Sequence, residues 1–311
     1  MKKKGFTLVE LLVVIAIIAL LMGILMPALA KVKAIAYRMV CGTNLAGLGK
    51  AMMIYAQDND DSYPVSGVRG IPVDWTDDDA MTIWDEPDPV DMVSVTQRTI
   101  TSSWYLLIKY AEVAPNQFVC RADTGTKAFK LSDTTTTETD LTQVWDFGVI
   151  DAGLLTQPGN YCSYAYHMPY DTVRIDAGSG AASPVAADRN VYLDKNAGSY
   201  KQGRDPEALP EWDDTKKTYV DPDKTGNASA HQREGQNVLF NDCHTTFAKY
   251  PNVGIDNDNI YQYWTSNPPA SQAEIQLDGN KPVGTGDGAA LSANDSYLVN
   301  ETQYGFVEDN N

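Results

Sequence analysis

Residues 11–30 read LLVVIAIIALLMGILMPALA, twenty residues without a charge, and they follow the basic residues Lys2, Lys3 and Lys4. About 20 apolar residues in a helix are enough to cross the hydrocarbon core of a membrane. Basic residues before such a segment hold the N-terminus in the cytoplasm. The whole chain nevertheless has a mean hydropathy of −0.31. The sequence therefore predicts one membrane-spanning stem carrying a polar body.

The apolar pattern continues beyond the stem, which argues against a cleaved signal peptide. No small-x-small cleavage site follows it. Apolar residues recur at helical spacing in two sets, Val32, Ile35 and Met39, then Leu45, Leu48, Met52 and Tyr55. The two sets are out of phase, so we expect a bend or a shift of the buried face near residues 41–44. The prediction is one long helix over residues 6–57, apolar in the membrane and amphipathic after it.

The composition fits a folded body and excludes several classes of partner. Of 311 residues, 43% are hydrophobic, and 41 acidic residues against 24 basic ones give a net charge of −17. Outside the first four residues there is no Lys/Arg cluster, so we expect no nucleic-acid partner. The four cysteines form no CxxC pair, which disfavours a zinc ribbon; they permit three disulfide pairings, and spacing does not choose among them.

From Ser62 onward apolar runs are short and separated by polar stretches. Candidate strands or short helices are 103–108, 161–166 and 237–242, the last forming a hairpin with 245–248. The stretches 74–95, 132–151 and 176–228 have no periodicity and are expected to be excursions from one sheet. The predicted fold class is α+β, with the long N-terminal helix packed on a loop-rich, mainly antiparallel sheet.

Glu10 places a carboxylate at the edge of the membrane segment. Such a group costs on the order of 2.5–3.5 kcal/mol on insertion scales, so it is hydrated at the headgroups or it has a partner. The surrounding residues favour a partner. The stretch KKKGFTLVELLVVIAIIALLMGILMPALA resembles the N-termini of type IV prepilins and type II secretion pseudopilins.

This resemblance implies roles for particular residues. Prepilin peptidase would cut after Gly5 and methylate the new terminus at Phe6, and Glu10 would pair with the terminal amine of a neighbouring subunit. Pro27, helped by Gly23, would kink or locally melt the helix so that the stems curve around a filament axis. The implied protein is a structural subunit without enzymatic activity.

The resemblance also implies partners, places and boundaries. The partners are identical or related pilin subunits, prepilin peptidase and an inner-membrane assembly platform. The chain would cross the inner membrane once, with its body in the periplasm, before entering a periplasmic or extracellular filament. The boundaries are a leader at 1–5, the long helix at 6–57, a pilin-like head at 58–264 and a polar C-terminal tail at 265–311.

Parts of the body resemble a group of large pilin-like proteins, including the segment from His231 to His244. There a histidine is followed after about nine residues by Asp-Gly in a strand turn. This chain has ten intervening residues and Cys243 in place of the glycine. The turn therefore avoids a positive φ or accepts strain to gain a cysteine. A disulfide from Cys243 to Cys120 or Cys162 would explain the exchange.

The sequence also offers two candidate metal sites and one alternative function. His231, Asp242, Cys243 and His244 are zinc-type ligands, but adjacent hairpin residues point to opposite faces, which disfavours a site. Asp256 and Asp258 place oxygen donors at a spacing that calcium can use, whereas no other cofactor is expected. The alternative function is a membrane-tethered periplasmic or extracellular ectodomain that binds carbohydrate through some of six tryptophans or acts as an enzyme.

Overall fold

The fold is that of a computed structural model. It describes residues 8–66, 99–133, 139–144, 146–147, 150–151, 154–155, 158–169, 173–193, 211–213, 218–220, 226–269, 275 and 290–300. Gly5, Phe6 and the excursion 74–95 lie outside the described residues. The predicted leader and the last residues of the predicted tail do so as well.

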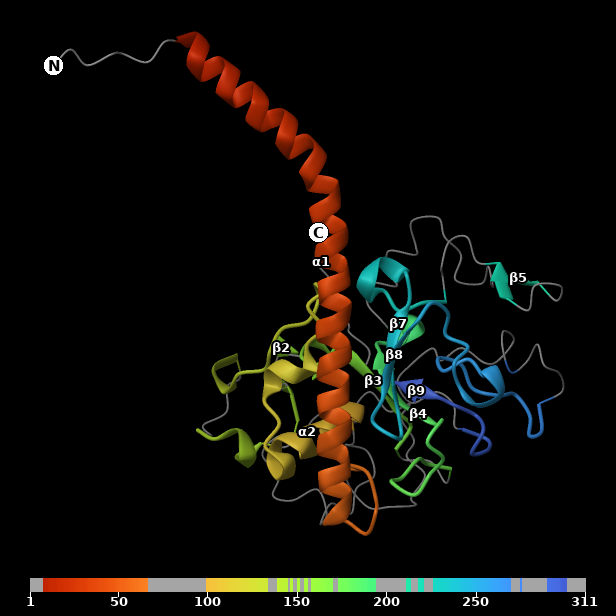
Figure 1. Cartoon of the computed structure of the whole chain (residues 1–311). Coiled ribbons are helices and arrows are strands. Elements are labelled where there is room, and N and C mark those ends of the chain that lie inside the picture. Colours follow the sequence, from red (N-terminus) through yellow and green to blue (C-terminus); the bar gives the residue numbers. More distant parts are fainter. Residues whose placement is uncertain are drawn as a thin grey trace, which may run out of the picture.

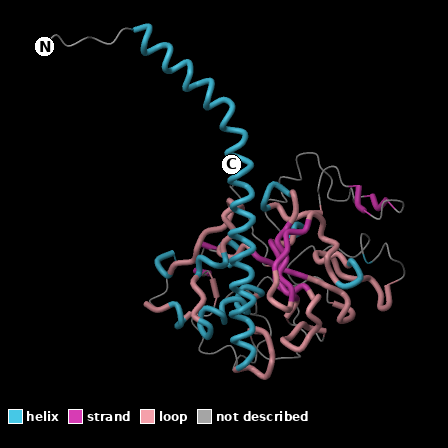
Figure 2. The backbone as a smooth tube through the Cα atoms, viewed as in Figure 1, coloured by secondary structure: helices cyan, strands magenta, loops and turns pink. Residues whose placement is uncertain are grey.

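Helix α1 spans Leu8–Gln57, 50 residues without a break. At about 1.5 Å per residue it is roughly 75 Å long. Its first half protrudes from the body and its second half lies along it (Figure 1). The tube view shows the same division, with the main group of strands beside the second half of the helix (Figure 2). The prediction of one long helix ending at Gln57 is confirmed.

The second helix, α2, spans Ile100–Ala111 and packs against α1. Its start is fixed by a capping box, in which Thr99 Oγ1 accepts from Ser102 N at 2.9 Å and Thr99 N donates to Ser102 Oγ at 3.3 Å. Its end is a left-handed residue, Glu112, with φ of 53°. The candidate segment 103–108 is therefore helical.

Five strands form one antiparallel sheet in the order β8-β7-β4-β3-β9. They are β3 (Tyr164–His167), β4 (Pro184–Asp188), β7 (Gln236–Phe240), β8 (Thr245–Ala248) and β9 (Leu298–Val299). Two small hairpins stand apart from it, β1 (Ile150–Asp151) with β2 (Leu154–Leu155) and β5 (Glu211–Asp213) with β6 (Thr218–Val220). Short 3₁₀ turns are η3 (Pro115–Phe118), η4 (Leu131–Asp133), η5 (Leu141–Gln143), η6 (Pro158–Asn160), η7 (Val191–Leu193), η9 (Ala230–Arg233) and η10 (Ile255–Asn257). The predicted α+β class is confirmed.

The β7–β8 hairpin is also confirmed, with Leu239 opposite Thr245. Its turn closes through Cys243 N donating to Phe240 O at 2.9 Å and Phe240 N donating to His244 O at 3.0 Å. Cys243 has φ of 66°, in the left-handed region that glycine adopts most easily. Of the two alternatives for this turn, the chain accepts the positive φ.

Two strands differ from the sequence expectation. β4, at the centre of the sheet, lies within 176–228, which was expected to be an excursion. Its residues, PVAAD, include no aromatic residue and begin with proline, so strand propensity is weak. β9 lies within 265–311, so part of the segment predicted to be a tail is packed in the head. Both strands are stabilised by partners distant in sequence, which local patterns do not show.

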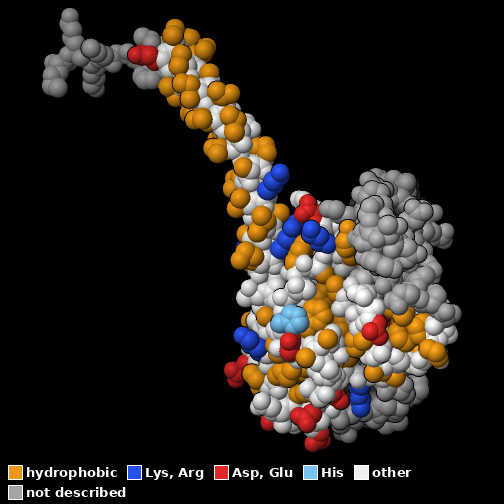
Figure 3. Space-filling view, turned by 45° about the vertical axis from the view of Figure 1, so that its right-hand side comes forward, with side chains coloured by type: hydrophobic (Ala, Val, Ile, Leu, Met, Phe, Trp, Pro, Cys, Tyr) orange, Lys and Arg blue, Asp and Glu red, His pale blue; other side chains and the backbone are white. Residues whose placement is uncertain are grey.

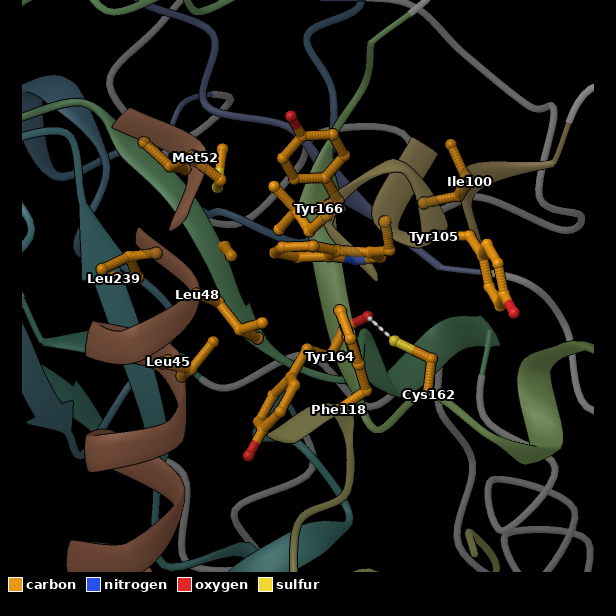
Figure 4. Close-up of a cluster of buried hydrophobic side chains, with 14 of the residues drawn as sticks. Leu45, Leu48, Met52, Ile100, Tyr105, Phe118, Cys162, Tyr164, Tyr166 and Leu239 are labelled. Carbon is orange, nitrogen blue, oxygen red and sulfur yellow. Dashed lines mark hydrogen bonds between the residues drawn. The ribbon is translucent and has the colours of Figure 1, made fainter. Parts of the chain in front are cut away.

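Alternating side chains bury both faces of the sheet. Tyr164, Tyr166 and Leu239 belong to the larger core cluster, between the sheet and the two helices. Ala165 and Val238 belong to the second cluster, which the segment around Ile260 and Tyr261 covers on the other face. Figure 4 shows Leu45, Leu48 and Met52 projecting from α1 into the larger cluster. The docked half of α1 is thus a structural part of the head.

Candidate functional site

The protruding half of α1, Leu8–Val40, is the most unusual surface of the described chain. Every residue from Leu8 to Lys33 is exposed, with Leu20 and Ile24 at 67% and 69%. Apolar side chains cover most of the face of this helix that Figure 3 shows. An 18-residue window has a mean hydropathy of 3.1, and the helix is long and apolar enough to cross a membrane. Among the described residues, the head leaves Leu8–Lys33 exposed.

Glu10 lies in the first turn of the protruding half and is exposed. A carboxylate in the first turn interacts favourably with the positive end of the helix dipole. The first turn also leaves backbone N–H groups without intrahelical partners, so the region favours negative charge. The position of Glu10 suits a contact with a cation outside its own helix.

Pro27 lies inside α1 and does not interrupt it. The expectation of local melting is not met, because the helix runs through Pro27. The protruding half curves away from the line of the docked half (Figure 1). Proline removes one backbone hydrogen bond, which permits such curvature without ending the helix.

Charged and aromatic residues mark the point where α1 reaches the head. The guanidinium of Arg38 forms an ion pair with Glu234 and lies over the ring of Phe247, 4.6 Å from its centroid. Figure 3 shows basic and acidic side chains together where the helix meets the body. These contacts attach the helix to the turn η9 and the strand β8 just before its buried half begins.

The docked half, Cys41–Gln57, packs through small and apolar residues: Cys41, Gly42, Leu45, Leu48, Gly49, Ala51, Met52 and Ala56 are buried. Gly49 is required by close approach, since a Cβ there would lie 2.9 Å from Leu239 Cδ1. The buried set starts at Cys41, whereas Val32, Ile35 and Met39 are exposed. Burial therefore begins at Cys41, within the region 41–44 where the sequence predicts a bend or a shift of the buried face.

A disulfide joins Cys41 of α1 to Cys120, which follows η3, with the Cα atoms 5.3 Å apart. Cys162 and Cys243 are free thiols. The predicted disulfide from Cys243 to Cys120 or Cys162 is therefore wrong. Cys120 lies beside α1, and the Sγ of Cys243 points to the helix surface at Gly49 instead. Burial raises the pKa of Cys162 to about 12, so that thiol stays protonated.

The structure separates the residues of the disfavoured zinc cluster. His244 and Asp242 are exposed, and their side chains form a hydrogen bond between His244 Nδ1 and Asp242 Oδ1. His231 is buried, and its Nε2 lies 3.3 Å from Asp188 Oδ2 and 3.5 Å from Cys120 Sγ. The sequence reasoning missed Asp188, because nothing near it in the chain resembles a ligand motif.

The proposed calcium residues have different surroundings. Asp256 is exposed and adopts φ of 58°. Asp258 is buried, and its two carboxylate oxygens accept hydrogen bonds from Trp264 Nε1 and Ser296 N. Burial is the main reason that the pKa of Asp258 rises to about 8, and nearby Asp295 adds to it. The contacts of Asp258 serve the fold, and calcium binding stays a prediction.

The carbohydrate-platform alternative relied on exposed tryptophans. Trp104 and Trp264 are the two whose side chains the structure describes, and both are buried. Trp104 packs against the rings of Tyr166 and Phe118 at 4.5 and 5.8 Å. Neither can stack on a sugar.

Comparison with known families matches residues 1–26 to the prokaryotic N-terminal methylation motif. No curated protein and no solved structure matched the chain. The chain thus has an N-terminal methylation motif, a long apolar helix that begins within it, and an antiparallel head packed on the second half of that helix. These are the features of a type IV pilin-like protein.

Proposed function

We propose that this protein is a structural subunit of a type IV pilus-like or type II secretion pseudopilus filament. Prepilin peptidase cleaves it between Gly5 and Phe6 and methylates Phe6. Before assembly the body lies in the periplasm, and residues 11–30 span the inner membrane. An inner-membrane assembly platform adds the subunit to a filament of identical or related pilins.

One observation carries this proposal: α1 is divided into a docked half and a protruding half that the head leaves uncovered. In lipid the protruding half is solvated by acyl chains. Between like helices there is no hydrophobic gain relative to lipid, so packing and polar pairs must supply the preference. The methylation motif supports the same function. It includes Gly5, three residues before the first described residue of α1, and Glu10, which lies in the first turn of that helix.

The proposed polar pair joins Glu10 of one subunit to the amine of Phe6 in its neighbour. An apolar surrounding makes an unpaired charge costly, so only the register that pairs them is favoured. The pair therefore sets the axial position of each subunit. The acidic head forms the outside of the filament.

The test is electron microscopy of sheared surface material from the native host carrying Glu10→Ala. The matched control is Asp58→Ala, which removes an exposed carboxylate just beyond the other end of α1. We expect filaments with the control and none with Glu10→Ala, while both proteins remain in the membrane. Filaments at the parental level in Glu10→Ala would contradict the proposed pairing.

A further inference from the structure

Four side chains that can ligate a metal meet where α1 enters the head. We name them the junction cluster: Cys41, Cys120, Asp188 and His231. One ligand atom from each lies within 4.8 Å of all the others, and all four residues are buried. They come from α1, the segment after η3, the end of β4 and η9. The fold has brought them together from four separate parts of the chain, and the function proposed above does not use them.

Two distances in the junction cluster match those expected around a tetrahedral zinc ion. Zinc bonds of about 2.3 Å to sulfur and about 2.0 Å to nitrogen or oxygen place neighbouring N and S ligands about 3.5 Å apart, and N and O ligands about 3.3 Å apart. His231 Nε2 lies 3.5 Å from Cys120 Sγ and 3.3 Å from Asp188 Oδ2. The histidine, carboxylate and one sulfur already have the spacing of ligands.

Asn237 holds the carboxylate in place. Its backbone N and its Nδ2 both donate to Asp188 Oδ2, at 2.6 and 3.1 Å. Such a partner is what a ligating carboxylate normally has in its outer shell. Asp188 Oδ1 is buried and has no hydrogen-bond donor among the described residues. A buried carboxylate oxygen left in this way is costly, and a cation would compensate it.

The backbone at His231 has an unusual conformation. His231, Gln232 and Arg233 have φ of 55°, 58° and 58°, although none of them is glycine. Each such residue costs roughly 1 kcal/mol or more, and such conformations concentrate at ligand clamps. This left-handed turn directs the imidazole of His231 to the sulfur of Cys120.

We propose that the chain with reduced cysteines binds one thiophilic divalent cation, with zinc the best match, through the junction cluster. The ligands are the two cysteine Sγ atoms, His231 Nε2 and an oxygen of Asp188. On binding, the two thiols release two protons and form two metal–sulfur bonds, and no electron is transferred. Tetrahedral zinc sites of sulfur, nitrogen and oxygen ligands are closed in this way when they are structural.

The disulfide and the metal ion exclude each other, because the disulfide occupies both sulfurs. Opening it takes two electrons and two protons. A dithiol supplies both and becomes a disulfide, whereas a phosphine supplies the electrons, becomes a phosphine oxide and takes its oxygen and the two protons from one water molecule. Closing it gives two electrons to an acceptor such as the disulfide of a thiol oxidoreductase. Both the disulfide state and the metal-bound state link Cys41 of α1 to Cys120. The metal state also links α1 to β4 and η9.

Burial of the junction cluster determines when the ion enters. All four residues are at most 3% exposed. An ion would therefore bind as the head closes around it during folding, before any oxidation. Metal binding of this kind contributes directly to the free energy of folding.

The test uses the full-length chain, unfolded and reduced with a phosphine under anaerobic conditions, freed of reductant, and refolded into detergent micelles in the presence of the metal ion. Cobalt and zinc ions are the probes. We expect one cobalt per chain, with the intense visible absorption and the sulfur charge-transfer band of tetrahedral thiolate-bound cobalt, and its displacement by zinc. The same chain with its disulfide formed should bind neither ion at this site.

Variants identify the ligands. His231→Gln and Asp188→Asn should each weaken cobalt binding on the order of 10-fold or more. His244→Gln is the matched control, because His244 is exposed and pairs with Asp242 instead. Correct formation of the Cys41–Cys120 disulfide on oxidation, mapped by peptide analysis, verifies that each variant folds. If a variant fails that check, the difference in cobalt binding between the reduced and the disulfide-bonded parental chain still tests the proposal.

Three results would overturn the proposal. The reduced chain could bind no cobalt, it could bind it equally after disulfide formation, or folded His231→Gln could bind it undiminished. None of them affects the filament proposal, which does not depend on the junction cluster.

Discussion

The two halves of α1 are built from the same kinds of residue but have opposite surroundings. In the protruding half Leu20 and Ile24 are about two-thirds exposed, whereas in the docked half Leu45 and Leu48 are completely buried. Within the protruding half, residues 11–30 are apolar all round. The docked half is apolar on one face, with Gly42 and Gly49 where β7 and β8 come closest.

This difference shows where each half obtains its stability. The docked half is stabilised by contacts within its own chain. In the protruding half, residues 8–33 are all exposed, and in the function proposed above lipid or other subunits cover them. The following substitutions test that division.

The largest effect should come from the disulfide at the boundary between the halves. Replacing Cys41 and Cys120 by alanine opens a link across 79 residues, and the chain-entropy account predicts a loss of about 4 kcal/mol from the free energy of unfolding. Urea unfolding followed by tryptophan fluorescence measures it under oxidising, metal-free conditions. As a control, a phosphine reductant should destabilise the parental chain to a similar degree and leave the double variant unchanged. An unaltered midpoint in the double variant would contradict this.

The second-largest effect should be the difference in head stability between two leucine substitutions in α1, one in each half. Leu48→Ala leaves a cavity beside the core aromatics and should cost about 3 kcal/mol of head stability. Leu20→Ala removes the same atoms from an exposed position and should change head unfolding by less than about 0.5 kcal/mol. The same urea experiment in detergent compares them. Equal losses would mean that the protruding half also supports the head.

The free energy of unfolding of the head should depend on pH because of the buried carboxyl group of Asp258. The pKa of Asp258 is about 8 in the folded chain and about 3.9 when unfolded. The folded state therefore binds more protons than the unfolded state between these values, so stability falls as pH rises. From pH 6.5 to 8 the loss from this group is about 2 kcal/mol.

Asp258→Asn should flatten that slope, and Asp256→Asn, at an exposed position, should keep it. Urea unfolding at pH 6.5 and 8 provides both values. The segment 11–30 contains no ionisable residue, so its helical circular-dichroism signal should not change over this range. A slope that persists in Asp258→Asn would show that another group causes it.

The smallest effects should come from two glycine-to-alanine substitutions in α1, one of which lowers stability while the other raises it. Gly49→Ala places a methyl group 2.9 Å from Leu239 Cδ1 and should cost about 1 kcal/mol of head stability. At Gly23 nothing lies within 4 Å of a new Cβ, so Gly23→Ala should increase local helix stability by up to about 1 kcal/mol. Hydrogen exchange of amides in each half distinguishes the two. A loss at both sites would mean that contacts outside the chain already cover Gly23 in detergent.

Local patterns predicted the parts of this fold that local physics decides. Helical periodicity located α1 to its last residue, and alternating apolar residues predicted the β7–β8 hairpin. The strand β4 could not be predicted, because PVAAD is stabilised by its neighbours in the sheet more than by its own propensity. The expectation for 103–108 left helix and strand open, and the capping box at Thr99 decides for helix.

The candidate sites divide in the same way. The methylation motif is contiguous, so sequence alone located it. The partner of Cys120 was predicted wrongly, because spacing does not indicate that α1 brings Cys41 next to it. Asp188 was missed for the same reason, since only the folded sheet places it beside His231.

The most direct test of the filament account is the intact mass and N-terminal sequence of the native protein. The account predicts a chain that begins at N-methylated Phe6, with Gly5 and the residues before it removed. An unprocessed chain beginning at Met1, or one cut beyond Ala30, would contradict it, because the protruding half would then be a plain anchor or would be lost.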